Sequence, residues 1–229
     1  MDIESSKKAA GYLAASFIKK NMIVGLGTGS TAYYFIEKLI QRNKEENLKI
    51  RAVASSLKSL EQAEKGGISI IDINEINSID ITVDGADEID EQKRMIKGGG
   101  GALLREKIIA SMSKEMVVVI DETKQSKQLG HRKLPVEVVP FGSKATLHKI
   151  EKQGLVGNFR LKNNDTTELY KTDNGNYIID IRFKDPIENP EKVHLLLKEI
   201  PGIVETGFFF HLAGRVIIAF LDGQILTLP

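Results

Sequence analysis

The chain has 229 residues, of which 41% are hydrophobic and 28% charged, and its formal net charge of +1 provides no basic field for nucleic acid. Cysteine is absent, which excludes disulfides and thiol catalysis and favours a cytoplasmic location. Residues 1–8 lack an apolar signal core, and no apolar run is long enough to cross a membrane. We therefore expect a cytoplasmic globular protein with no nucleic-acid or membrane partner.

Helical spacing alternates with short apolar runs over the first 120 residues. Apolar residues at helical spacing predict helices at 9–18, 32–40, the segment ending at 66–67, and 102–113. Short apolar runs predict strands at 22–26, 49–54, 68–73, 79–83 and 116–120. This order predicts an α/β fold with a doubly wound, mainly parallel, Rossmann-like sheet, whose ligands bind beyond the carboxyl ends of the strands.

The pattern changes near residue 130, where a second architecture is predicted. Two prolines bracket an apolar run at 136–139, and the later segments read as helix 144–153, a hairpin at 169–183 turning at Asn174-Gly175, and helix 190–200. Further strands are predicted at 207–210, 215–220 and 224–228, and we expect them to return to the first sheet. The sequence thus predicts a Rossmann-like domain of residues 1–130 plus 207–229 and a smaller α+β lid domain of residues 131–206.

The first predicted strand runs directly into Gly27-Thr28-Gly29-Ser30-Thr31. This loop lacks the lysine of a P-loop and the third glycine of a dinucleotide-binding fingerprint. Two interpretations stay open. The loop is either a turn with Ser or Thr capping the next helix, or a small anion cradle made of hydroxyls and helix N-terminal amides.

Three aspartates, Asp84, Asp87 and Asp90, recur at every third position after the fourth strand of the first domain. They would share one face if the backbone were helical there. A capped and solvated turn, a magnesium site, and carboxylates tuned to different protonation states are the alternatives, whereas the spacing of a calcium-binding loop is not met. The third alternative suits carbohydrate chemistry.

Lys97 precedes four consecutive glycines, residues 98–101, and the helix that follows carries Glu106. Four glycines in a row cost backbone entropy and pack no side chains, so we expect them where the backbone approaches a ligand closely. Lys97 and Glu106 are a candidate acid–base pair. Lys124, at the end of the fifth strand, is predicted on the same ligand side of the sheet, although most lysines are only solvated surface.

The four histidines and the run Phe208–Phe210 are interpreted as structural. The four histidines show no metal-ligand spacing, and Phe208-Phe209-Phe210 reads as core or subunit-interface material. A phosphate cradle, clustered carboxylates, a lysine and a glutamate, without a nucleotide or redox signature, indicate general acid–base chemistry on a small phosphorylated sugar.

The motifs closely resemble ribose-5-phosphate isomerase of the A type. The resemblance rests on four stretches, Gly25–Ala32, Val83–Ile89, Met95–Gly100 and Arg105–Lys107, and extends to Lys7, Lys124, Leu134–Val138 and Thr172–Asn176. It covers nearly the whole chain in the same order and spacing. One departure is Gly101, which stands where many relatives carry alanine; we expect it to leave the mechanism intact and to loosen the helix start.

The resemblance implies interconversion of ribose 5-phosphate and ribulose 5-phosphate through an enediolate, in the non-oxidative pentose phosphate pathway, without metal or organic cofactor. It implies that Glu106 is the base that moves a proton between C2 and C1. Lys97 would stabilise the developing oxyanion, and Asp84 and Asp87 would hold sugar hydroxyls and assist ring opening. The other implied substrate-binding residues are Thr28, Gly29, Ser30 and Thr31 for the phosphate, with Lys124 and Lys7 as counter-charges, and Gly85, Ala86, Gly98, Gly99 and Gly100.

The family resemblance also implies a homodimer or homotetramer. A second function class stays open, namely a sugar-phosphate-sensing module of the same fold that binds its effector without chemistry. Such a sensor needs no Glu106 beside Lys97, and a transcriptional regulator would carry a helix-turn-helix that this sequence lacks. A deaminase or transferase on a similar fold would need a different nucleophile or an ammonia-handling histidine.

Overall fold

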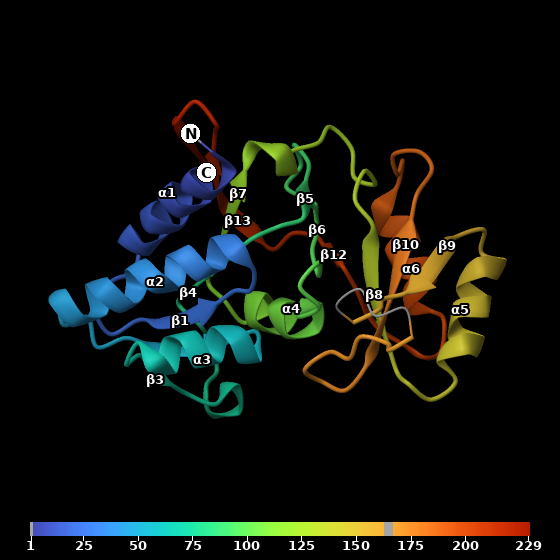
Figure 1. The fold of residues 1–229 in the computed structure, drawn as a ribbon, viewed down its shortest axis with the longest axis horizontal. Helices are drawn as coiled ribbons and strands as arrows, with labels where there is room; N and C mark the ends of the chain where they lie inside the picture. The colour runs from blue at the N-terminus through green and yellow to red at the C-terminus, as the bar shows by residue number, and fades with distance from the viewer. Residues whose placement is uncertain (1, 163–166) are drawn as a thin grey trace. The chain divides into compact units, whose positions relative to one another are not determined.

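The computed structural model describes residues 2–162 and 167–229, which form two compact units. Unit 1 contains Met1–Ala86, Arg105–Lys124 and Leu212–Pro229, and unit 2 contains Asp87–Leu104 and Gln125–His211. Figure 1 shows the elements of each unit in chain order. Among the described residues, no helix has the length and apolarity needed to cross a membrane.

Unit 1 is built on a seven-stranded sheet with the order β14-β13-β7-β4-β1-β2-β3. Its strands are β1 (Ile23–Leu26), β2 (Arg51–Ala54), β3 (Ser69–Ile70), β4 (Ile81–Asp84), β7 (Met116–Asp121), β13 (Ala213–Ala219) and β14 (Ile225–Leu228). Every neighbouring pair is parallel except β13 with β14. The predicted doubly wound, mainly parallel sheet is therefore confirmed.

The helices of unit 1 are α1 (Ile3–Ser16), α2 (Ser30–Glu45), α3 (Leu57–Lys65) and the part of α4 (Leu103–Ser111) that follows Leu104, with short 3-10 turns η1 (Ile73–Glu75) and η2 (Glu122–Lys124). Consecutive β2 residues Ala52 and Val53 belong to different apolar clusters, the first with α1 and α2 and the second with Ile109 of α4. Because successive strand residues face opposite sides, the two clusters lie on opposite faces of the sheet. Helix α1 begins earlier than predicted because Asp2 caps it, accepting from the amide of Ser5 at 2.7 Å.

Unit 2 contains two small antiparallel sheets and two helices. The four-stranded sheet has the order β11-β8-β10-β9, and the three-stranded sheet the order β12-β6-β5. The elements are β5 (Glu88–Ile89), β6 (Met95–Ile96), β8 (Leu134–Val138), α5 (Ser143–Lys152), β9 (Val156–Phe159), β10 (Tyr177–Arg182), α6 (Pro190–Lys198), β11 (Ile203–Thr206) and β12 (Phe208–Phe209). One apolar cluster joins residues of both sheets, including Ile96, Val136, Ile179 and Phe208.

Unit 2 is larger than the segment 131–206 that the sequence suggested as a lid. Residues 87–104 join it because β5 and β6 form a sheet with β12, and Leu129 lies in its apolar cluster. Strand β12 thus pairs with β6 instead of returning to the first sheet, whereas β13 and β14 do return. A lid function for unit 2 stays a prediction.

Of the predicted hairpin at 169–183, the structure contains the turn and the second strand. Gly175 has a φ of 78°, and its amide donates to the carbonyl of Thr172 at 2.9 Å, as the Asn-Gly signal predicts. Strand β10 follows the turn, but its partner segment makes only the bridge of Lys171 with Tyr177 in the described residues. Strand β9, which the sequence did not predict, pairs with β10 from Ile179 to Arg182.

Candidate active site

The residues predicted to form the site divide between the two units. Unit 1 holds Lys7, the loop 28–31, residues 84–86, Glu106 and Lys124. Unit 2 holds Asp87 and residues 97–100.

In unit 1, the loop after β1 is tied to the end of β4. The amide of Thr28 donates to Oδ1 of Asp84 at 3.0 Å, and the hydroxyl of Thr28 shares a 2.7 Å hydrogen bond with Ser55, which follows β2. A Cβ on Gly27 would overlap the carboxyl of Asp84, so glycine permits this close approach. The prediction that polar residues meet at the carboxyl edge of the sheet is confirmed for these strands.

Helix α2 begins without a side-chain cap. Its N-cap residue is Gly29, with a φ of 102° and no side-chain hydrogen bond to the first turn. Thr28 directs its hydroxyl to Ser55, Ser30 is exposed at the helix start, and Thr31 is buried. The first amides of a helix have no intrahelical acceptor, and the helix dipole favours an anion there. This geometry favours the anion cradle over the capped turn.

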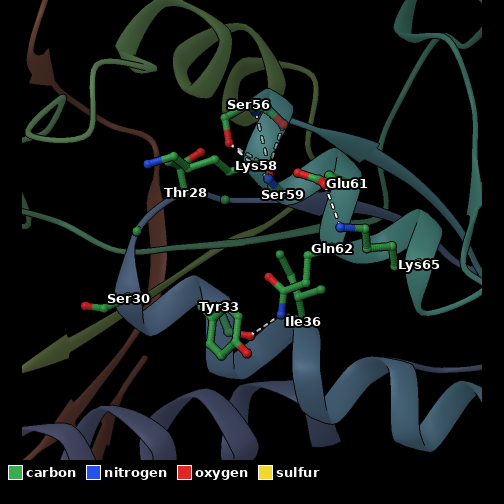
Figure 2. A pocket seen from close by; sticks show the side chains of 12 residues that line it. Thr28, Ser30, Tyr33, Ile36, Ser56, Lys58, Ser59, Glu61, Gln62 and Lys65 are labelled. Atoms are coloured by element: carbon green, nitrogen blue, oxygen red, sulfur yellow. Dashed lines mark hydrogen bonds and ion pairs between the residues drawn. The ribbon is translucent and has the colours of Figure 1, made fainter. Parts of the chain in front are cut away.

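The same loop lines a cavity of about 590 Å³ in unit 1, shown in Figure 2. The opposite wall is made by residues at and after the start of α3, namely Ser56, Lys58, Ser59, Glu61, Gln62 and Lys65. Lys65 pairs with Glu61 at 2.6 Å, and Ser56 and Ser59 form the capping box of α3. This wall was not predicted from the sequence, although the Ser55-Ser56 pair after β2 was a usable signal.

Asp84 and Glu106 are buried carboxyl groups of unit 1. Asp84 is 1% exposed, and its Oδ1 also accepts from the amide of Gly85 at 2.8 Å. Glu106 is 5% exposed and occupies the first turn of α4. Because Asp and Glu are rarely so buried, both are candidates for proton transfer.

The two predicted counter-charges of unit 1 have different surroundings. Lys124 ends η2 directly after β7 and is half-buried. Lys7 lies inside α1, where its Nζ is 3.7 Å from Oε2 of Glu4. Lys7 is therefore already next to a carboxylate in its own helix.

In unit 2, the glycine run is linked to Asp87. Oδ2 of Asp87 accepts from the amide of Gly99 at 2.7 Å. Gly98 and Gly101 have φ values of 100° and 83°, and the amide of Gly101 donates to the carbonyl of Gly98 at 2.9 Å. Glycine is therefore favoured at positions 98 and 101 because the backbone there forms a tight turn with left-handed φ values.

Lys97 is buried, with 3% of its surface exposed. Its amide donates to the carbonyl of Gly207 at 2.8 Å, and its Nζ lies 5.4 Å from the ring centroid of Phe209. A buried lysine on an aromatic face is not a solvated surface residue. Phe208 and Phe209 are themselves buried, which confirms that they are core residues.

The idea that the three aspartates share a helical face is wrong. Asp84 ends β4, and the chain then enters β5 instead of a helix. Asp90 accepts from the amides of Gln92 and Arg94 at 3.0 and 2.9 Å and from Nε of Arg94 at 2.7 Å. Asp90 therefore stabilises the turn between β5 and β6.

No group of three or more His, Asp or Glu side chains among residues 2–162 and 167–229 is arranged to hold a metal ion.

Arg160 and Tyr170, which were not predicted as site residues, contact the carbonyl groups of the glycine run in unit 2. No motif marks either residue. A usable signal was Asp180, a charged residue within the apolar strand 178–181, because a buried carboxylate requires a cationic or hydrogen-bonding partner.

Comparisons with known proteins extend over almost the whole chain. Residues 51–223 match the family model described as ribose 5-phosphate isomerase A (phosphoriboisomerase A). The chain is 53% identical over 219 residues to ribose-5-phosphate isomerase A of Protochlamydia amoebophila, covering 96% of this chain and 93% of that protein.

Solved structures of similar proteins have the same fold. The ribose 5-phosphate isomerase of Plasmodium falciparum superposes with a TM-score of 0.94 at 35% identity, covering 98% of each chain. A D-ribose-5-phosphate isomerase in complex with phospho-erythronic acid superposes with a TM-score of 0.93 at 35% identity, covering 100% of this chain and 99% of that one. The chain therefore belongs to the ribose 5-phosphate isomerase A family.

Proposed function

We propose that this chain is an aldose–ketose isomerase that interconverts D-ribose 5-phosphate and D-ribulose 5-phosphate. The observation that carries the proposal is the buried carboxyl of Glu106, in the first turn of the helix after the glycine run, in a chain of this family. The sensor alternative is not favoured, because the relatives that match the whole chain are named as isomerases.

Glu106 acts as the base on the open-chain aldose. Its carboxylate takes the proton from C2, the C2–H electron pair forms the C1–C2 double bond, and the aldehyde oxygen becomes the enediolate oxyanion. A proton then passes from the C2 hydroxyl to the oxygen on C1. Glu106 returns its proton to C1, and C2 becomes the ketone. Burial of Glu106 supports this role because it limits competition from water for the proton.

Lys97 and the amides of residues 98–100 stabilise the oxyanion, and Asp87 holds a sugar hydroxyl. The burial of Lys97 supports its assignment, since a charge acts more strongly on a developing oxyanion when water is excluded. Asp84 assists ring opening by proton transfer, and its burial at the end of β4 supports that role. Residues 85 and 86 complete the binding surface as backbone contacts.

The phosphate group of the substrate binds at residues 28–31, with Lys124 and Lys7 as counter-charges. The uncapped start of α2 supports this assignment, because its amides and the hydroxyl of Ser30 are suited to an anion. The predicted cytoplasmic location and the homodimer or homotetramer remain proposals. Light scattering on a size-exclusion column tests the oligomer.

The deciding experiment compares Glu106→Gln with the matched control Glu64→Gln, which changes an exposed glutamate on α3. We expect Glu106→Gln to lower kcat by about 10³-fold, the usual effect of losing a general base, and to stop exchange of C2 deuterium with water. Binding of phospho-erythronic acid should persist. Near-normal turnover of ribose 5-phosphate by Glu106→Gln would remove Glu106 from the base role.

A second measurement tests the expectation that no metal is required. The wild-type protein is assayed with ribose 5-phosphate before and after dialysis against a chelator. Unchanged turnover is expected, and loss of activity that added magnesium restores would contradict the proposed cofactor-free mechanism.

A further inference from the structure

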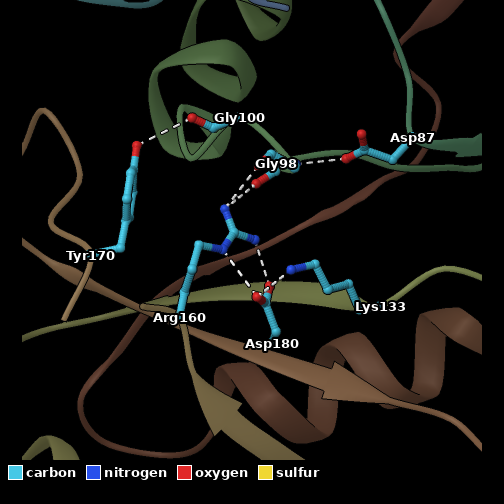
Figure 3. A network of polar contacts seen from close by, with 8 residues as sticks. Asp87, Gly98, Gly100, Lys133, Arg160, Tyr170 and Asp180 are labelled. Atoms are coloured by element: carbon cyan, nitrogen blue, oxygen red, sulfur yellow. Dashed lines mark hydrogen bonds and ion pairs between the residues drawn. The ribbon is translucent and has the colours of Figure 1, made fainter. Parts of the chain in front are cut away.

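Three successive carbonyl groups of the glycine run are held by side chains from a distant part of unit 2 (Figure 3). Nη1 of Arg160 donates to the carbonyl oxygens of Gly98 and Gly99 at 2.9 and 3.1 Å. The hydroxyl of Tyr170 donates to the carbonyl oxygen of Gly100 at 3.2 Å. The run therefore depends on residues 61 to 70 positions further along the chain.

Arg160 is itself fixed by an ion pair. Asp180 of β10 accepts from Nε of Arg160 at 3.0 Å and from Nη2 at 2.5 Å, and Lys133 donates to the same carboxyl at 2.6 Å. The side chains of Arg160 and Asp180 are 10% and 11% exposed. Two parallel hydrogen bonds set the plane of a guanidinium group, so the remaining nitrogen, Nη1, has a defined direction.

Tyr170 packs beside the same guanidinium, with 5.8 Å between its ring centroid and Cζ of Arg160. Burial, followed by the charge of Asp173, raises the pKa of Tyr170. The phenol therefore keeps its proton and remains a donor to Gly100.

Fixing these carbonyl groups also fixes amide directions. In a planar trans peptide, the carbonyl of one residue and the N–H of the next point to opposite sides. The contacts of Arg160 thus set the amides of Gly99 and Gly100, and the contact of Tyr170 sets the amide of Gly101. The amide of Gly99 donates to Asp87, a residue assigned to the substrate. Glycine adopts many backbone conformations, so without these contacts the run has no side chain of its own to hold it.

We propose that Arg160 is a positioning residue of the isomerase, which acts by orienting the backbone amides of Gly99 and Gly100. Asp180 and Lys133 orient Arg160, and Tyr170 completes the hold. The inference rests on the proposed function, which assigns these amides to the enediolate. Arg160 itself touches neither the substrate nor the reacting atoms in this proposal.

The test compares Arg160→Ala with Arg182→Ala in steady-state assays on ribose 5-phosphate. A cavity of about 300 Å³ is lined by Arg160, Asp180 and Arg182, among others. Arg182 is exposed at the end of β10 and has no hydrogen bond to the glycine run in the described residues. Misplaced stabilising groups lower the rate of the chemical step more than they weaken binding. We expect Arg160→Ala to lower kcat by about 10- to 100-fold with less than a threefold change in KM, and Arg182→Ala to change neither.

Chemical rescue distinguishes orientation from general stability. The cavity beside Arg160 gives a small cation access to Asp180. Guanidinium chloride at low, non-denaturing concentration should raise kcat of Arg160→Ala severalfold, whereas sodium chloride should not. Arg160→Lys should stay impaired, since one ammonium cannot reproduce the planar set of donors.

A folded Arg160→Ala variant with wild-type kcat, or with a raised KM and unchanged kcat, would overturn the inference, as would equal effects of the two chloride salts. If Arg160→Ala does not fold, Tyr170→Phe decides in its place, with kcat expected to fall about threefold or more at constant KM and wild-type kcat counting against the inference. Absence of turnover by the wild-type protein would instead defeat the proposed function.

Discussion

The amide of Thr28 donates to Oδ1 of Asp84 at 3.0 Å, which joins the loop after β1 to the end of β4. The amide of Gly85 donates to the same oxygen at 2.8 Å. One oxygen of this carboxyl thus holds two loops of unit 1, while the proposed function assigns the carboxyl to proton transfer. The structural and chemical roles of Asp84 can therefore be separated by substitution.

Asp84→Asn should keep the fold and lose activity. The asparagine oxygen can still accept from both amides, but the side chain cannot accept a proton, so we expect kcat to fall by about 10²-fold with little change in the free energy of unfolding. Asp84→Ala removes the acceptor and should lower that free energy by about 1–3 kcal/mol. Steady-state kinetics and urea unfolding measure the two effects. Equal destabilisation by both variants would show that the charge, and not the acceptor, holds the loops.

Ser30→Ala and Lys124→Ala should mainly weaken substrate binding. Each removes one contact proposed for the phosphate, and a hydrogen bond to a charged group contributes about 1.5–3 kcal/mol, so KM for ribose 5-phosphate should rise about tenfold or more at nearly constant kcat. Lys127→Ala, at an exposed lysine three positions after Lys124, is the matched control. The same assays with unphosphorylated ribose should show no change in kcat/KM. An equal loss with both sugars would argue against a phosphate contact.

The ion pair of Asp180 should make stability depend on pH. Burial alone would raise the pKa of Asp180, but Arg160 and Lys133 lower it below the ordinary value of 3.8. A carboxyl with a depressed folded pKa contributes stability that is complete above its unfolded pKa and is lost as pH falls through the folded pKa. Asp180→Asn should therefore be less stable than wild type by about 3 kcal/mol at pH 7. This difference should be constant down to about pH 5 and shrink below about pH 4.

Urea unfolding at pH 7, 5, 4 and 3 measures this difference in the free energy of unfolding. Asp185→Asn, at an exposed aspartate in the same unit, is the control and should differ little from wild type at any pH. A destabilisation by Asp180→Asn that is the same at pH 3 and pH 7 would contradict the prediction.

The sequence predicted the parts of the fold and site that depend on local patterns. The apolar runs located β1, β4 and β7, and parallel pairing then placed Thr28 and Asp84 at one edge of the sheet. The contacts of Arg160 with the glycine run could not be predicted, because 61 or 62 positions separate the partners and no period or motif relates them. Strand β12 was misplaced for a similar reason. Two phenylalanines fit either sheet, and only the pairing with β6 selects one.

Tyr170 gives Gly101 a specific structural role in this chain. The φ of Gly101 is 83°, and a Cβ at this position would overlap the hydroxyl and ring of Tyr170. From the sequence, Gly101 was expected only to loosen the start of α4. The structure gives it a further role. It makes room for the tyrosine that holds Gly100.

Gly101→Ala should consequently lower the free energy of unfolding of this chain. The loss should be smaller when a smaller residue replaces Tyr170. The left-handed backbone alone costs an alanine about 1–2 kcal/mol, and displacement of the Tyr170 ring adds to that loss. Tyr170→Val removes the overlap, so the double variant Gly101→Ala/Tyr170→Val should be more stable than the sum of the single effects predicts, by about 0.5–3 kcal/mol. Urea unfolding of the four proteins of this cycle measures the coupling. Additive losses would mean that the ring of Tyr170 moves aside at no cost, and that backbone conformation alone selects glycine at this position.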